Sequence, residues 1–87
     1  MKLNKSNIES LESPAKDKFF WDDELKGFGL RVSPQGKKSF IVQYRQDGRS
    51  KRIRIGQFGR ITAFNARRDA RILLFDVSAH GTEFGLG

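Results

Sequence analysis

Alternation of apolar and polar side chains dominates the middle of the chain and predicts three β-strands, at about residues 27–33, 38–46 and 50–56. In each strand one face is apolar and the other is polar or basic, a pattern typical of a sheet that is covered on one side. The apolar face is expected to carry Phe28, Leu30, Val32, Phe40, Val42, Tyr44, Ile53 and Ile55.

Two turn sequences join these strands, and both favour the same sidedness. Asp47-Gly48 is a preferred pair for a two-residue type I′ turn, and Pro34-Gln35-Gly36 suits a three-residue loop with Gly36 in the left-handed region. A slip of one residue in either hairpin would turn arginines into the core. The turns predict these pairs: Gln46 with Arg49, Gln43 with Arg52, Val42 with Ile53, Ile41 with Arg54, Phe40 with Ile55, Leu30 with Phe40, and Arg31 with Ser39.

A change of period after "GQFGR" predicts a helix over about residues 62–80. Thr62 is a suitable N-cap, His80 falls in the last turn, and Gly81 is expected to end the helix. One stripe of the helix is apolar and should cover the apolar face of the sheet. It consists of Ala63, Ala66, Ala70, Leu73, Leu74 and Val77.

Phe64, Ile72 and Phe75 fall outside that stripe. We expect the aromatic segment Phe19–Trp21, which should pack over an open edge or end of the core, to cover them. The alternative is that they form a docking patch. Trp21 is accordingly interpreted as a core residue rather than a platform on which bases stack.

These elements predict an α+β fold, in which a three-stranded antiparallel meander packs on one C-terminal α-helix. With 87 residues the chain can form one small domain, expected at 19–81. Residues 1–18 are interpreted as a polar N-terminal tail with at most a short helical turn at about 4–11, and 82–87 as a C-terminal tail or linker.

The distribution of charge limits the kinds of ligand that the domain can bind. The formal net charge is +7, and the segment 36–71 holds eleven Lys and Arg against two acids, Asp47 and Asp69. A solvated surface normally interleaves both signs, so this segregation favours a surface that binds a polyanion. The three arginines of the predicted helix, Arg67, Arg68 and Arg71, fit either a solvated helix face or a flank that reaches phosphates.

The uncovered face of the sheet is the candidate binding surface. Arginine binds phosphate and the major-groove edge of guanine through two donors, and glutamine suits adenine. A narrow antiparallel ribbon fits the major groove of double-stranded DNA, with flanking lysines on phosphates. The candidate DNA-binding residues are Arg31, Lys37, Lys38, Ser39, Ile41, Gln43, Arg45, Arg49, Arg52 and Arg54.

The ordered motifs "KGFGLRV", "GKKSF", "YR" before a tight turn, "ITAFNAR" and "SAHG" resemble the amino-terminal domain of phage and genomic-island integrases of the tyrosine recombinase family. The resemblance covers Asp22 to Gly81. It implies a three-stranded sheet packed on a helix, which binds arm-type DNA sites in the major groove through Arg31, Gln43, Arg45, Arg52 and Arg54. Members of that family usually continue into an Asp-Pro and a second domain, whereas this sequence reads "TEFGLG". We therefore expect an excised, monomeric domain with partners in double-stranded DNA and in the other domains of a parent integrase.

No catalytic set can be assembled from the sequence, so we expect a non-enzymatic module without cofactor or metal. Tyr44 should pack in the core, His80 should lie on the surface, and Asp22, Asp23 and Glu24 should form a surface turn. The absence of cysteine suits a reducing cytosol, and we expect the protein in the bacterial cytosol, associated with the nucleoid. Two other functions stay open: binding of double-stranded or ribosomal RNA, and protein interaction through an exposed helix face.

Overall fold

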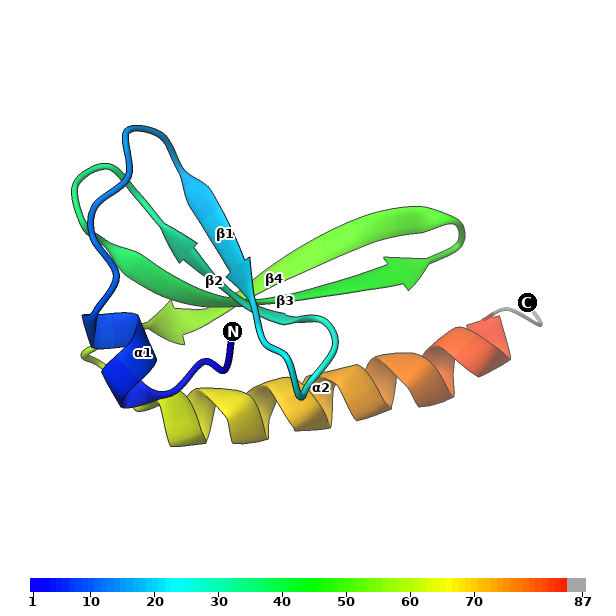
Figure 1. The fold of residues 1–87 in the computed structure, drawn as a ribbon. Coiled ribbons are helices and arrows are strands. Elements are labelled where there is room, and N and C mark those ends of the chain that lie inside the picture. The colour runs from blue at the N-terminus through cyan, green and yellow to red at the C-terminus, as the bar shows by residue number, and fades with distance from the viewer. Residues whose placement is uncertain (85–87) are drawn as a thin grey trace.

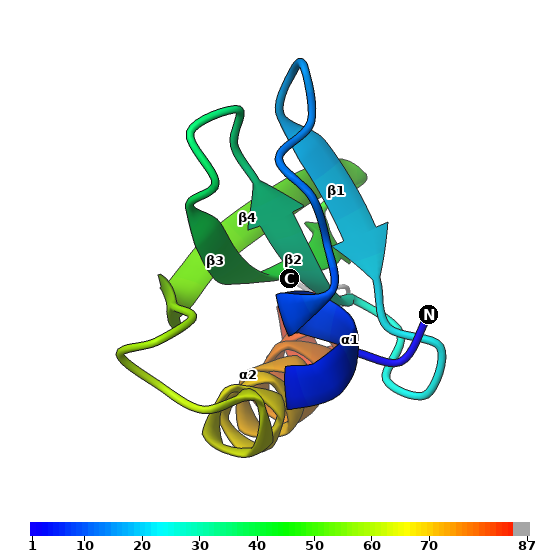
Figure 2. The same cartoon turned by 60° about the vertical axis from the view of Figure 1, so that its left-hand side comes forward.

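The computed structural model describes residues 1–84, and among them the side chains of residues 1–75. The elements are α1 (Lys5–Glu9), β1 (Lys18–Trp21), β2 (Phe28–Val32), β3 (Lys38–Gln46), β4 (Arg49–Gln57) and α2 (Ala63–Phe84). The strands form an antiparallel sheet in the order β1-β2-β3-β4. Both helices lie under the same face of this sheet, and the hairpin of β3 and β4 projects beyond β1 and β2 (Figures 1 and 2).

The described sheet has four strands, so the prediction of three was wrong. The additional strand is β1, in which Phe19 pairs with Arg31 and Phe20 pairs with Leu30. Pairing with β1 satisfies the backbone edge of β2, which a three-stranded sheet would leave open. The segment was predicted to lie at an edge of the core but not as a strand, because three consecutive aromatic residues hide the alternation that marks one.

The hairpin of β3 and β4 turns at Asp47 and Gly48, whose φ angles of 54° and 76° are both positive, as a type I′ turn requires. The predicted pairs are confirmed from the turn as far as Ile41 with Arg54. Beyond that point the register shifts, and Phe40 pairs with Gly56 instead of Ile55. The predicted pairing of Phe40 with Ile55 was therefore wrong.

The register shift depends on Gly56. A Cβ atom at this position would lie 2.9 Å from Cδ1 of Ile61, so a larger residue would require the Ile61 side chain to move. The register shift is a β-bulge that adds one residue to β4, so the side chains beyond it change faces. Gln57 consequently pairs with Ser39. In the other hairpin the pairs of Leu30 with Phe40 and Arg31 with Ser39 are confirmed.

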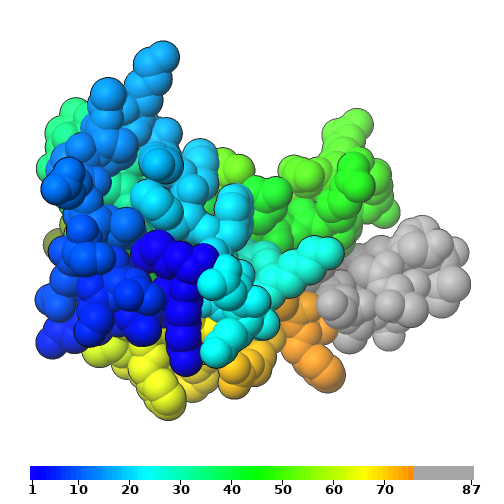
Figure 3. Space-filling view, viewed as in Figure 1, coloured from blue at the N-terminus to red at the C-terminus, as the bar shows by residue number. Residues whose placement is uncertain are grey.

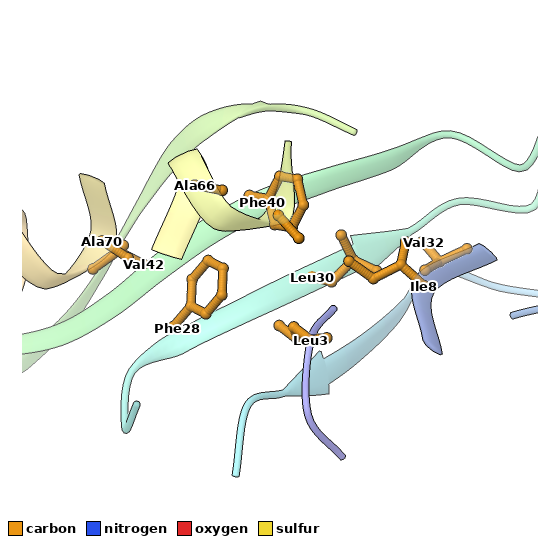
Figure 4. Packing of buried hydrophobic residues seen from close by; sticks show 10 residues of the cluster. Leu3, Ile8, Phe28, Leu30, Val32, Phe40, Val42, Ala66 and Ala70 are labelled. Atoms are coloured by element: carbon orange, nitrogen blue, oxygen red, sulfur yellow. The ribbon is translucent and has the colours of Figure 1, made fainter. Parts of the chain in front are cut away.

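The core lies between the sheet and the two helices (Figure 4). Phe28, Leu30 and Val32 of β2 and Phe40 and Val42 of β3 are fully buried there. The rings of Phe28 and Phe40 stack with centroids 5.7 Å apart. The helix α2 contributes its small residues Ala63, Ala66 and Ala70, which allow its backbone to approach the strands closely.

The N-terminal segment belongs to this core. Leu3 and Ile8 are 1% and 0% exposed, and each such burial contributes about 2 kcal/mol. Asn4 caps α1 by accepting a hydrogen bond from the amide of Asn7 at 2.8 Å, which confirms the expected short helix. The description of the remainder as a polar tail missed these two apolar side chains.

The outer face of α2 is not covered as predicted. Phe64, Ile72 and Phe75 are 76%, 54% and 72% exposed, because β1 lies at the edge of the sheet and only Phe20 of its aromatic residues packs against the core. The helix also continues through Gly81 to Phe84 instead of ending at Gly81. The side chains of Val77 and His80 and the whole of residues 85–87 lie outside the described residues.

Candidate nucleic-acid interface

The sheet face opposite the helices forms a groove of about 480 Å³. In the space-filling view the molecule is hollowed between β1 and the projecting hairpin of β3 and β4 (Figure 3). Strand alternation places one set of side chains from β2, β3 and β4 on this face, among them Arg31, Ser39, Arg52 and Arg54. The groove is lined by Arg31, Ser33, Gln35, Lys37, Ser39, Ile41, Arg52, Arg54 and Gln57.

Six of the ten predicted residues line this groove: Arg31, Lys37, Ser39, Ile41, Arg52 and Arg54. Gln43 and Arg45 line a neighbouring depression that also includes Trp21. Arg49 is exposed beside the turn. Ile41 is 3% exposed, so it forms part of the groove floor.

Lys38 does not join the others. It pairs with Val32, whose side chain is buried in the core, and its Nζ donates a hydrogen bond to the carbonyl oxygen of Ile8 at 2.8 Å. Its ammonium therefore lies at the C-terminal end of α1, where a cation is favourable. The sequence placed Lys38 near a loop tip and gave no sign of this long-range contact.

Sequence reasoning missed several residues of this face. Gln57 enters the groove because of the bulge, and the glycine inside the predicted strand, Gly56, was the available signal. Phe19 and Trp21 lie on the same side, since β1 pairs Phe19 with Arg31 and Trp21 with Gly29. Trp21 is 38% exposed, so its interpretation as a core residue was wrong.

Arg31 is held by Asp17. Both Nε and Nη2 of the guanidinium donate hydrogen bonds to Oδ2 of this carboxylate, the Nε contact at 3.1 Å. The two side chains are 52% and 38% exposed, so the pair lies in contact with solvent. An exposed pair of this kind contributes little to stability, but it fixes the orientation of one arginine in the groove.

Arg52 is held from two sides. Its Nη2 donates to Oε1 of Gln43 at 2.9 Å, and its guanidinium carbon lies 4.2 Å from the centre of the Phe19 ring. The Phe19 ring in turn stacks on Trp21, with centroids 6.2 Å apart. Trp21 lies over Gly29, where an added Cβ would come within 2.5 Å of the indole. Side chains of β1 and β3 therefore order this arginine of β4, and Gly29 of β2 leaves room for the aromatic pair.

Asp22 is buried rather than part of a surface turn, which corrects the sequence interpretation of this residue. Its carboxylate accepts two hydrogen bonds from Arg67, both at 2.7 Å, and further ones from the amides of Leu3 at 2.8 Å and Leu25 at 2.7 Å. Burial acts to raise the pKa of Asp22, but these hydrogen bonds outweigh it and lower the pKa from 3.8 to about 2. The same contact raises the pKa of Arg67.

Arg67 is therefore a structural residue. It lies neither on a solvated helix face nor at a flank that reaches phosphates, which were the two interpretations of the helix arginines. Its Nη2 also donates to the carbonyl of Leu3 at 3.1 Å, so it joins α2 to the N-terminal segment and to the end of β1. Arg68 contacts Asp69 at 3.5 Å, and Arg71 is exposed. The basic groove is built from the sheet and not from these residues.

The described residues include no group of three or more His, Asp or Glu side chains placed to hold a metal ion. No helix in this part of the chain is both long and apolar enough to cross a membrane.

Comparison with known proteins agrees with this geometry. No curated protein matches the sequence. The profile of the family described as arm DNA-binding domain matches residues 3–83, a range that includes the buried Leu3 and nearly all of α2. The chain is a DNA-binding domain and belongs to the arm DNA-binding domain family, which is the amino-terminal arm domain of integrases.

Proposed function

We propose that this domain binds arm-type sites in double-stranded DNA by laying the groove face of its sheet in the major groove. The observation that supports this best is the open concave face with Arg31, Arg52, Arg54 and Lys37 along it.

Within this proposal the domain has no catalytic activity and serves as the amino-terminal module of a tyrosine-recombinase integrase that acts in the bacterial cytosol. By binding a second DNA segment, it raises the effective concentration of the catalytic part at the sites of strand exchange. A monomeric module with one groove is sufficient for that task. Integration and recombination would then be activities of the parent protein, to which this domain contributes binding energy and site choice.

The test is a salt-controlled titration of a duplex with Arg54→Ala. Arg54 lies in the groove, and losing one phosphate contact reduces the magnitude of the slope of log K against log salt by about 0.9. We expect weaker binding and that reduced slope, with an unchanged thermal melting curve. Lys5→Ala is the matched control, because Lys5 is exposed in α1 on the other side of the sheet. Wild-type affinity and slope for Arg54→Ala would overturn the assignment of the face.

Insertion of the sheet into a major groove favours DNA over an RNA duplex, because the major groove of A-form RNA is too deep and narrow for a sheet. Competition between DNA and RNA duplexes of the same sequence tests this directly. Preferential binding of the RNA would contradict major-groove insertion.

One observation favours a second candidate function, protein interaction through α2: Phe64, Ile72 and Phe75 are largely exposed on its outer face. Amide shift mapping separates the two candidates. Shifts confined to the sheet on addition of DNA support the first. An absence of shifts with DNA, together with concentration-dependent association of the domain, supports the second.

A further inference from the structure

Two arginines of the groove are held in place, one by Asp17, which directly precedes β1, and the other by Phe19 in β1. Asp17 binds Arg31 through two nitrogens, and the ring of Phe19 lies against the guanidinium of Arg52. No comparable contact holds Arg54 or Arg45 among the described residues. The basic face thus contains two kinds of arginine. Arg31 and Arg52 are oriented before DNA binds, whereas no such contact orients Arg54 and Arg45 in the described part of the chain.

The contact with Asp17 leaves Arg31 with the donors that guanine needs. A guanidinium has five N–H groups, and Asp17 uses the one on Nε and one on Nη2. Both hydrogens on Nη1 and the second on Nη2 remain, and they form the end of the fork that pairs with O6 and N7 of guanine. Because the carboxylate already fixes the plane of the fork, less side-chain freedom is lost when the base is bound.

Asp17 also makes Arg31 a poor phosphate ligand. The carboxylate is 38% exposed on a face that would meet DNA, and it repels the phosphate backbone. A carboxylate at this point is unfavourable for general binding of a polyanion and favourable only if it directs an arginine to a base edge. The charge pattern therefore distinguishes Arg31 from a residue that serves to neutralise phosphate.

Arg52 is positioned by a different device. The Phe19 ring lies 4.2 Å from its guanidinium carbon and restricts it on one side, and the hydrogen bond to Gln43 uses one N–H of Nη2. Nε and Nη1 keep their donors. The stack continues through Phe19 to Trp21, so the aromatic pair forms a rigid support for one side of the guanidinium.

We propose that Asp17 and Phe19 are positioning residues that make Arg31 and Arg52 the two guanine readers of the groove, while the other basic residues bind phosphates. This inference rests on the proposed function and deepens it, since it assigns base readout to two residues out of the basic set. It also gives β1 a role in recognition beyond closing the edge of the sheet.

The experiment begins with selection of duplexes by the wild-type domain from a pool with 20 randomised base pairs. The dissociation constants for the selected duplex and for a scrambled duplex of equal composition are then measured at one salt concentration. For Asp17→Asn we expect binding of the selected duplex to weaken by about tenfold, while binding of the scrambled duplex stays equal or tightens. Repeating the selection with Asp17→Asn and with Arg31→Ala should remove the preference for the same guanine.

Glu9→Gln is the matched control for Asp17→Asn. It makes the same change of charge on an exposed residue of α1, away from the groove, and should preserve the ratio of the two dissociation constants. If Asp17 acted through its charge alone, Asp17→Asn would tighten binding of both duplexes equally, and that result would overturn the inference. Failure of the wild-type domain to enrich any duplex would instead overturn the proposed function.

Phe19→Leu tests the second reader independently and keeps an apolar side chain in the strand. We expect it to lower the preference at a different guanine, the one lost in selections with Arg52→Ala, with a thermal melting curve close to that of the wild type. Unchanged preference at that guanine in a folded Phe19→Leu domain would contradict the role of the aromatic support.

Discussion

Replacing Asp22 with asparagine should destabilise the domain more than any other single change of a charged residue among those described. The Asp22 side chain has no exposed surface and receives hydrogen bonds on both oxygens, from Arg67 and from backbone amides. An asparagine has an NH₂ group in place of one carboxylate oxygen. This NH₂ group would face N–H donors, so those donors would lose their acceptor. Arg67, with a side chain only 14% exposed, would lose its counter-charge.

The magnitude follows from the pKa and the burial. The lowering of the Asp22 pKa from 3.8 to about 2 corresponds to about 2 kcal/mol of stability at neutral pH. Breaking a buried ion pair by removing one partner costs about 3–5 kcal/mol, because the other charge stays buried. The free energy of unfolding of a domain of this size is only about 5–10 kcal/mol. We therefore expect Asp22→Asn to lose a large share of that free energy.

Urea denaturation followed by circular dichroism measures this loss, with Asp23→Asn as the control. Asp23 is 68% exposed and contacts the N-terminal ammonium, so its replacement should cost less than about 1 kcal/mol. Since the folded-state pKa of Asp22 is depressed, its stabilisation is complete above about pH 5 and is lost as the pH falls through 2. The difference in free energy of unfolding between the wild type and Asp22→Asn should therefore become smaller as the pH falls over that range. The reasoning would be refuted if Asp22→Asn lost less than about 1 kcal/mol of unfolding free energy at pH 7. It would also be refuted if the difference from the wild type stayed constant down to pH 2.

Three further substitutions have defined outcomes. Gly29→Ala places a Cβ within 2.5 Å of the Trp21 indole and should displace it, which shifts tryptophan fluorescence to the red and costs about 1–3 kcal/mol; unchanged emission would contradict the stacked arrangement. Gly48→Ala meets no atom within 4 Å, so only its φ of +76° is unfavourable, and thermal melting should show a loss of about 1 kcal/mol. A much larger loss would mean that the turn is of another type. Lys38→Met removes the hydrogen bond to Ile8 and should cost about 1 kcal/mol in urea denaturation without changing the salt slope of DNA binding. A reduced slope would place Lys38 at the DNA.

The hairpins could be predicted because their signals are local. Asp47-Gly48 fixes the turn type, and the alternation on either side of it fixes which face of each strand is apolar. Together with the loop at Pro34–Gly36, these signals were enough to place Arg31, Arg52 and Arg54 on one face. The same reasoning failed at Gly56, where the strand bulges beside Ile61, because alternation along one strand does not reveal a packing partner outside it.

The elements that could not be predicted depend on partners that are far away in sequence. Leu3 and Ile8 are isolated apolar residues in a polar segment, and only the gap between α2 and the edge of the sheet explains their burial. Asp22 stands in an acidic run that has the composition of a surface turn, and its partner Arg67 follows 45 residues later. A short strand of consecutive aromatic residues, Phe19–Trp21, has no period that a sequence pattern can detect.

These unpredicted elements form one connected structure, which links stability to recognition. Asp22 follows β1 directly, its amide donates to the carbonyl of Phe28 at 2.9 Å, and its carboxylate joins that end of β1 to Arg67 on α2. The position of β1 in turn sets where Phe19 meets Arg52. Weakening the buried ion pair should therefore loosen β1 before the hairpin of β3 and β4, which has its own turn and register. A partly destabilised domain would then retain the cations that bind phosphate and lose the order of the arginine that Phe19 supports, so discrimination between DNA sequences should fall at a lower urea concentration than DNA binding itself.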